Sequence, residues 1–134
     1  MSYDQLVIFF NFGVDGATAG AQTYYFDDMI FVVGGSSGNT GTCTSPCIDF
    51  ASPSVKYQPF EGLVSAEQSG DPVDASNKVA KFVKGPTGQP WAGATVYTID
   101  ATQSVPEFDL SGSKIVTLRV YSPVAGMNIR MKLE

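Results

Sequence analysis

The order of the strand-like runs is the feature that most constrains the fold of this chain. Residues 6–12 and 23–33 are apolar runs joined by a Gly-containing turn, and a Gly/Ser/Thr-rich stretch, 34–42, follows them at once. Further strand-like runs then continue to the last residue. Two buried strands joined by such a turn are how β-sandwiches usually finish. This order therefore places the closing strands of a sheet before its opening strands. A sheet left unfinished has open edges, which must be paired, covered or blunted.

Short runs of alternating polarity predict an all-β fold. Apolar residues make up 43% of the chain and charged residues 16%, a composition that excludes a disordered segment. No window shows the 3.6-residue period of a helix longer than one turn. In the clearest strand, 115–123, alternation puts Val116, Leu118 and Val120 on one face and Thr117, Arg119 and Tyr121 on the other.

The same pattern predicts three parts of the chain. Residues 1–33 carry the closing strands of a β-sandwich module, and 48–134 carry the opening strands of one. Between them, 34–47 is predicted to be a flexible linker that contains Cys43 and Cys47. The two cysteines are predicted to form a short-loop disulfide, which implies an oxidising, extracellular compartment. A zinc site is excluded, because there is no His and no second cysteine pair to complete it.

Charge and composition narrow the classes of partner. The net charge is −5 with only 8 Lys and Arg, so phosphate neutralisation and nucleic-acid binding are not expected. No apolar run reaches the roughly 18 residues of a membrane span. Because the chain has no His, it offers no ordinary Ser-His or Cys-His nucleophile pair. We therefore expect a protein that is not an enzyme.

Three segments carry a resemblance to a known family. They are KVAKFVKGPTGQPWAG, FDLSGSKIVTLRVYSPVAGMNIRMKLE and YDQLVIFFNFG with TYYFDDMIF. They resemble carbohydrate-binding-module-like β-jelly-roll domains that are appended to secreted bacterial polysaccharide-degrading enzymes. In that family further strands follow the K-L-E strand, and the Y-D strand comes after them. The resemblance therefore implies one of three things: a jelly-roll β-sandwich that is permuted and shortened, a fragment that spans the junction of two modules, or a sandwich completed by strands of a neighbouring chain.

The resemblance implies non-catalytic binding of an extracellular polysaccharide. Aromatic faces stack on sugar C–H groups, and polar side chains bind the hydroxyls. The residues predicted to contact the sugar are Trp91, Tyr97, Arg119, Tyr121 and Arg130. Two alternatives stay open: Trp91 caps the core, and the polar face of the strands is ordinary solvent-facing surface.

The resemblance also implies a structural Ca²⁺ site. Asp27 and Asp28 interrupt an apolar strand, so strict alternation turns one of them inward, where a carboxylate needs a cation or strong donors. Related modules hold Ca²⁺ between an early Glu and an acidic residue of the last strand, and Glu61 with Asp28 or Asp27 match those positions. The alternative is that these acids cap loop amides or pair with Lys.

A second function of a different class follows from the strand order. The chain is then a structural subunit of an extracellular assembly, in which strands 6–12 and 23–33 complete a neighbour's sheet. The linker would allow the first two strands to reach across. Such exchange makes a polymer or ring when it is head-to-tail, and a dimer when it is reciprocal.

Overall fold

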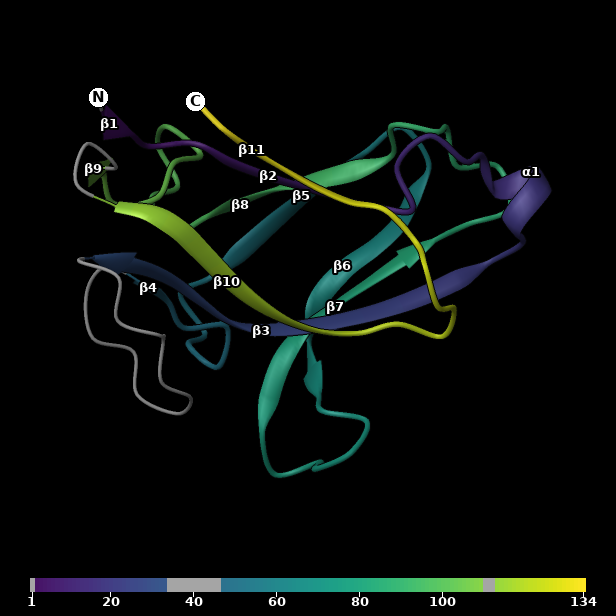
Figure 1. Cartoon of the computed structure of the whole chain (residues 1–134), viewed down its shortest axis with the longest axis horizontal. Coiled ribbons are helices and arrows are strands. Elements are labelled where there is room, and N and C mark those ends of the chain that lie inside the picture. Colours follow the sequence, from purple (N-terminus) through teal and green to yellow (C-terminus); the bar gives the residue numbers. More distant parts are fainter. Residues whose placement is uncertain (1, 34–46, 110–112) are drawn as a thin grey trace.

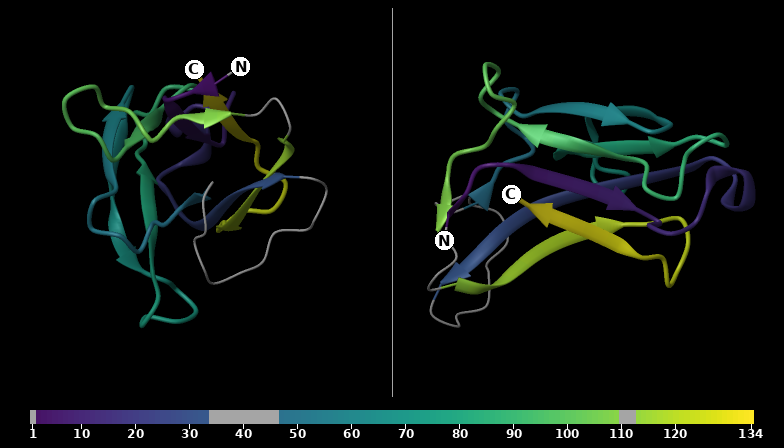
Figure 2. Two further views of the ribbon diagram at one scale, coloured as in Figure 1. Left: turned by 90° about the vertical axis from the view of Figure 1, so that its left-hand side faces the viewer. Right: turned by 90° about the horizontal axis from the view of Figure 1, so that it is seen from above.

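The computed structural model describes residues 2–33, 47–109 and 113–134. These residues form an all-β sandwich of two antiparallel sheets packed face to face, as predicted, together with a separate two-stranded pair (Figures 1 and 2). The elements are β1 (Ser2–Tyr3), β2 (Leu6–Phe10), α1 (Gly16–Ala19), β3 (Gln22–Val33), β4 (Cys47–Ile48), β5 (Lys56–Phe60), β6 (Leu63–Gly70), β7 (Lys78–Lys84), β8 (Gly93–Tyr97), β9 (Phe108–Asp109), β10 (Ser113–Tyr121) and β11 (Ile129–Leu133).

Each sheet has an N-terminal strand at its centre. The first sheet has the order β10-β3-β7-β6, with β4 also paired to β3, and the second has the order β11-β2-β8-β5. In the second sheet Ile8 lies opposite both Met131 and Ala94. In the first, Phe26 lies opposite both Val120 and Ala80. The strands of 1–33 thus complete the sheets of their own chain in this structure.

The two ends of the chain meet beside the second sheet. The backbone N–H groups of Asp4 and Gln5 donate to the carbonyl oxygen of Glu134, over 2.9 and 3.0 Å. The Glu134 N–H returns a bond to the Gln5 carbonyl. Figure 1 shows both termini at the same end of the sandwich. These bonds extend the β2–β11 pairing to the last residue.

Aromatic side chains from both sheets fill the core. Phe10 of β2 stacks on Tyr24 of β3 with 4.8 Å between ring centroids, and Phe26 meets Phe82 of β7 edge-to-face at 4.8 Å. All four are buried. Burying each such ring contributes about 1.5–3 kcal/mol, so this cluster helps to hold the two sheets together.

The side formed by β10 and β11 is less well covered than the core centre. Val116, Leu118 and Val120 pack against the core but stay partly exposed, which confirms the face assigned to them from alternation. Met131 and Leu133 of β11 behave in the same way. Both strands are sheet edges, so their side chains have neighbours on one side only.

Several sequence predictions lie outside the described residues. Residues 34–46, which make up nearly all of the predicted linker, are among them, and so is Cys43. The Cys43–Cys47 disulfide therefore stays a prediction. Within the described ranges no helix is long and apolar enough to span a membrane.

Candidate functional site

A hollow of about 770 Å³ lies on the outer side of the first sheet. Strands β3 and β10 form its floor, and the β6–β7 loop, which projects away from the sandwich in Figure 1, forms one wall. We call it the β3–β10 hollow. Its polar and aromatic lining residues are Tyr25, Phe26, Asp27, Asp28, Asp49, Asp71, Asp74, Asn77, Arg119 and Tyr121.

A bulge in β3 delivers two consecutive acids to this hollow. Thr117 pairs with Ile30 and Arg119 pairs with Asp27, so β3 holds one more residue than β10 between these pairs. Asp28 has φ +54°, a left-handed conformation that Asp adopts more readily than most residues. One of the two acids, Asp27, is buried, and because the bulge breaks the alternation both Phe26 and Met29 reach the core.

Asp27 is held by two donors. Its Oδ2 accepts a hydrogen bond from Asn77 Nδ2 at 3.1 Å and one from the Arg119 guanidinium at 3.5 Å. Arg119 also reaches Asp28 Oδ2 at 3.2 Å. Asp27 is only 7% exposed, and these partners satisfy a carboxylate that would be costly to bury alone. The alternative expected these acids to pair with Lys, whereas in the structure their cationic partner is Arg119.

Asp28 has a raised pKa. Burial is the largest cause, the neighbouring charge of Asp27 adds to it, and Asp49 adds a little more. The Arg119 guanidinium acts in the opposite direction. The hollow is therefore a site where negative charge exceeds the positive charge available to it.

Side-chain hydrogen bonds shape the β6–β7 loop. Asp71 Oδ1 accepts from the Val73 N–H at 2.8 Å, the main reason why the pKa of Asp71 is lowered. Asp74 Oδ1 accepts from the Ser76 N–H at 3.1 Å and from the Ser76 hydroxyl at 2.6 Å. These turns fix the loop wall in place, with Asn77 aimed at Asp27.

Two tyrosines form the aromatic part of the hollow. Tyr25 and Tyr121 are cross-strand partners, and their rings meet edge-to-face at 6.1 Å between centroids. Tyr121 is 51% exposed, which leaves much of its surface free to contact a ligand. The hollow thus combines aromatic surface with fixed polar groups.

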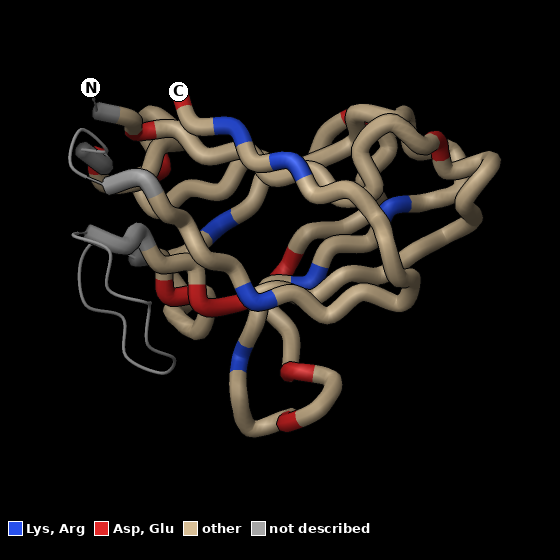
Figure 3. The backbone as a smooth tube through the Cα atoms, in the orientation of Figure 1, with Lys and Arg blue, Asp and Glu red and all other residues tan. Residues whose placement is uncertain are grey.

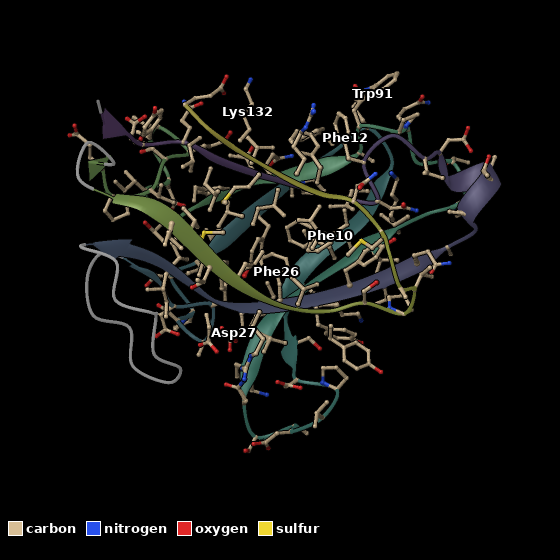
Figure 4. All side chains as sticks on the ribbon, in the orientation of Figure 1. Phe10, Phe12, Phe26, Asp27, Trp91 and Lys132 are labelled. Carbon is tan, nitrogen blue, oxygen red and sulfur yellow. The ribbon has the colours of Figure 1, made fainter. Side chains whose placement is uncertain are left out.

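The residues predicted to contact a sugar lie on two different sides of the molecule. Arg119 and Tyr121 lie in the β3–β10 hollow. Trp91 and Arg130 belong to the other side of the molecule, and Figure 4 shows Trp91 and Asp27 on opposite sides of the core. Tyr97 lies on the second sheet too, as the last residue of β8 opposite Lys56.

An aromatic patch on the second sheet, made of Phe9, Phe12 and Phe60, lies beside Arg130. Its guanidinium lies 4.0 Å from the centroid of the Phe12 ring. Phe12 contacts Phe9 edge-to-face at 5.4 Å, and Phe9 contacts Phe60 at 5.8 Å. Trp91 is 50% exposed, so it does not fill the core.

The sequence did not predict every residue of the β3–β10 hollow or of the aromatic patch. Asn77 and Tyr25 were not singled out, and only the pairing of β3 with β7 and β10 brings them together. Phe9 sits in the dense apolar run 6–12, where its neighbours in sequence do not distinguish it as a surface residue. Gly93 lies opposite Phe9 and leaves room for its ring, since a Cβ at Gly93 would come within 2.8 Å of Phe9 Cδ1.

The structure does not bring Glu61 together with Asp27 and Asp28. Glu61 precedes β6, beyond the end where Leu63 pairs with Lys84 and Lys84 with Gln22. Asp27 is five residues further along β3 than Gln22, about 16 Å at the usual rise of a strand. Among the described residues no group of three or more His, Cys, Asp or Glu is placed to hold a metal ion.

A lysine ammonium lies near the Glu61 turn. Lys84 is buried, and its Nζ donates to the carbonyl oxygens of Phe10, Asn11 and Val14 at 3.4, 3.2 and 2.8 Å. A Cβ at Gly88 would come within 3.0 Å of Lys84 Cγ, and one at Gly62 within 2.6 Å of Gly88 Cα, so the Lys84 side chain passes close to this turn. The positive charge that binds these main-chain oxygens is therefore the ammonium of Lys84.

Comparisons of the chain with protein-family models, with curated proteins and with solved structures find no match. The chemistry of the residues in the β3–β10 hollow and the aromatic patch is therefore the basis for a proposed function.

Proposed function

We propose that this protein is a non-catalytic module that binds an extracellular polysaccharide through the β3–β10 hollow. One observation carries the proposal: two tyrosine rings lie beside a preformed set of carboxylate, amide and guanidinium groups in a hollow of about 770 Å³. This volume falls in the range of small-molecule sites in proteins.

The chemistry of the hollow suits a sugar ring. The C–H face of a pyranose packs on Tyr121 or Tyr25, whose rings are rigid and partly exposed. Neighbouring hydroxyls donate to the carboxylates of Asp27 and Asp28 and accept from Arg119. Because Asn77 and Arg119 already hold Asp27 in place, little ordering is required when the ligand binds.

Calorimetric titration tests the proposal directly. The ligands are six-unit oligosaccharides of glucose, xylose, mannose, N-acetylglucosamine, glucosamine and galacturonic acid. We expect at least one to bind without being cleaved, and Tyr121→Ala to weaken that binding about tenfold, the loss of one aromatic contact.

Trp91→Ala is the matched control. It removes a half-exposed aromatic ring from the opposite side of the sandwich, and we expect it to leave the affinity unchanged. Loss of binding in Trp91→Ala with full binding in Tyr121→Ala would move the site to the second sheet. Absence of binding by every oligosaccharide would overturn the proposed function.

A further inference from the structure

The charges around the β3–β10 hollow bear on which sugars it admits, an inference that rests on the proposed function. We infer that the hollow prefers a sugar with a protonated amine, as in glucosamine units, over the neutral N-acetylated sugar, and that it disfavours uronic acids.

The hollow is lined by far more negative than positive charge. Its carboxylates come from three parts of the chain: Asp27 and Asp28 from β3, Asp49 from the segment after β4, and Asp71 and Asp74 from the β6–β7 loop. Arg119 is the only Lys or Arg among the lining residues that the structure describes. Figure 3 shows acidic positions on β3 and in the loop, beside one basic position on β10.

Arg119 is already committed to the two acids of β3. Its guanidinium bridges Asp27 and Asp28 at 3.5 and 3.2 Å. The contacts of the remaining carboxylates are with neutral donors: Asp49 with the Ala51 N–H, Asp71 with N–H groups and Asn77, and Asp74 with Ser76. Hydrogen bonds from neutral donors do not cancel the negative charge of these groups, although the charge of Arg119 also acts on Asp71.

A protonated sugar amine is attracted to these carboxylates, and it can be compared with a neutral sugar that is otherwise the same. Glucosamine differs from N-acetylglucosamine only in the acetyl group on its nitrogen, and its ammonium donates to carboxylates as a hydroxyl does. A partly enclosed site screens charge less than open water, so one ammonium near several carboxylates gains appreciably. A uronate in the same place would face like charges.

The test compares three hexamers by calorimetry at about pH 6, in low salt and in about 0.5 M salt. The hexamers are made of glucosamine, N-acetylglucosamine and galacturonic acid. We expect the glucosamine hexamer to bind about tenfold more tightly than its acetylated form in low salt, with the ratio falling in high salt. The galacturonic acid hexamer should bind most weakly.

Two double variants assign the preference to the hollow. Asp49→Asn with Asp74→Asn keeps an acceptor oxygen at each position and removes two charges from the hollow, so the glucosamine preference should fall several-fold. Asp100→Asn with Glu134→Gln removes two charges that pair with Lys56 and Lys132 on the second sheet, and the preference should persist.

The outcomes separate this inference from the proposed function. Equal binding of the glucosamine and N-acetylglucosamine hexamers, or tighter binding of the galacturonic acid hexamer, would overturn the inference and leave sugar binding in place. An equal fall of the preference in both double variants would also overturn it, because the preference would then follow net charge alone. Binding of no oligosaccharide would overturn both.

Discussion

Asp28 combines a left-handed backbone conformation with a raised pKa. Because its folded-state pKa lies above the ordinary value of 3.8, the folded protein binds more protons than the unfolded chain between these two pH values. Stability therefore falls as pH rises through that window. The full cost of ionising Asp28 in the folded protein is present above its folded-state pKa. At neutral pH an ionised Asp28 costs the fold free energy.

Asp28→Asn should stabilise the protein at neutral pH. Asn tolerates φ +54° as well as Asp does, and it removes the repulsion from Asp27. We expect a gain of about 0.5–1 kcal/mol at pH 7, the scale of an exposed charge interaction, that vanishes below pH 4. Urea unfolding across this pH range measures it. A loss of stability at pH 7 would show that the contact between Asp28 and Arg119 outweighs the repulsion.

Lys84 has a structural role that depends on three carbonyl oxygens. Burial lowers its pKa, and the nearby charge of Asp15 partly opposes this effect. Lys84→Met keeps the length of the side chain but leaves the carbonyls of Phe10, Asn11 and Val14 without this donor. We expect a cost of about 2–4 kcal/mol in the free energy of unfolding.

Lys78→Met is the control for that measurement. Lys78 is exposed at the start of β7, and its replacement should change stability by no more than about 0.5 kcal/mol. Similar effects of the two variants in chemical denaturation would mean that the Lys84 hydrogen bonds contribute little.

The strands differ in how completely they bury their core-facing side chains. Phe26 on the central strand β3 is 2% exposed, whereas Leu118 on the edge strand β10 is partly exposed. Phe26→Ala should cost about 3–5 kcal/mol, and Leu118→Ala about 1–2 kcal/mol, since less of its surface leaves water on folding. Thermal and urea unfolding of both variants measure this contrast. Equal losses of unfolding free energy in the two variants would mean that Leu118 is as well buried in solution as Phe26.

Alternation predicted the two faces of β10 correctly. Val116, Leu118 and Val120 were placed on the core side and Arg119 and Tyr121 on the outer side from the sequence alone. The same rule failed at Asp27 and Asp28, because a bulge is set by the register between β3 and β10. The grouping of Asn77 with Asp27 also depends on pairing between distant strands, which no local pattern contains.

The whole molecule depends on its first 33 residues, since β2 and β3 are the central strands of the two sheets. A chain of residues 47–134 would lack β2 between β11 and β8, and β3 between β10 and β7. We expect this fragment to be unfolded by circular dichroism and to fold when a peptide of residues 1–33 is added. A fragment that folds alone would contradict the central role of these strands.

The same pairing defines what strand exchange would require. Strands β2 and β3 would leave their places in one sandwich and occupy the same places in another. Because they pair within their own chain in this structure, we expect a monomer by light scattering behind a sizing column across a hundredfold range of concentration. A stable dimer or polymer would favour the structural-subunit function instead.

Chemical-shift mapping by NMR tests the central claim most directly. A nitrogen-15-labelled sample is titrated with the oligosaccharide of the panel that binds most tightly. We predict shifts at the backbone amides of Tyr25 and Tyr121 and at the Asn77 side-chain amide, with the indole N–H of Trp91, the only tryptophan, unmoved. Shifts that centre on Trp91 and Phe12, with the β3–β10 hollow silent, would contradict the account.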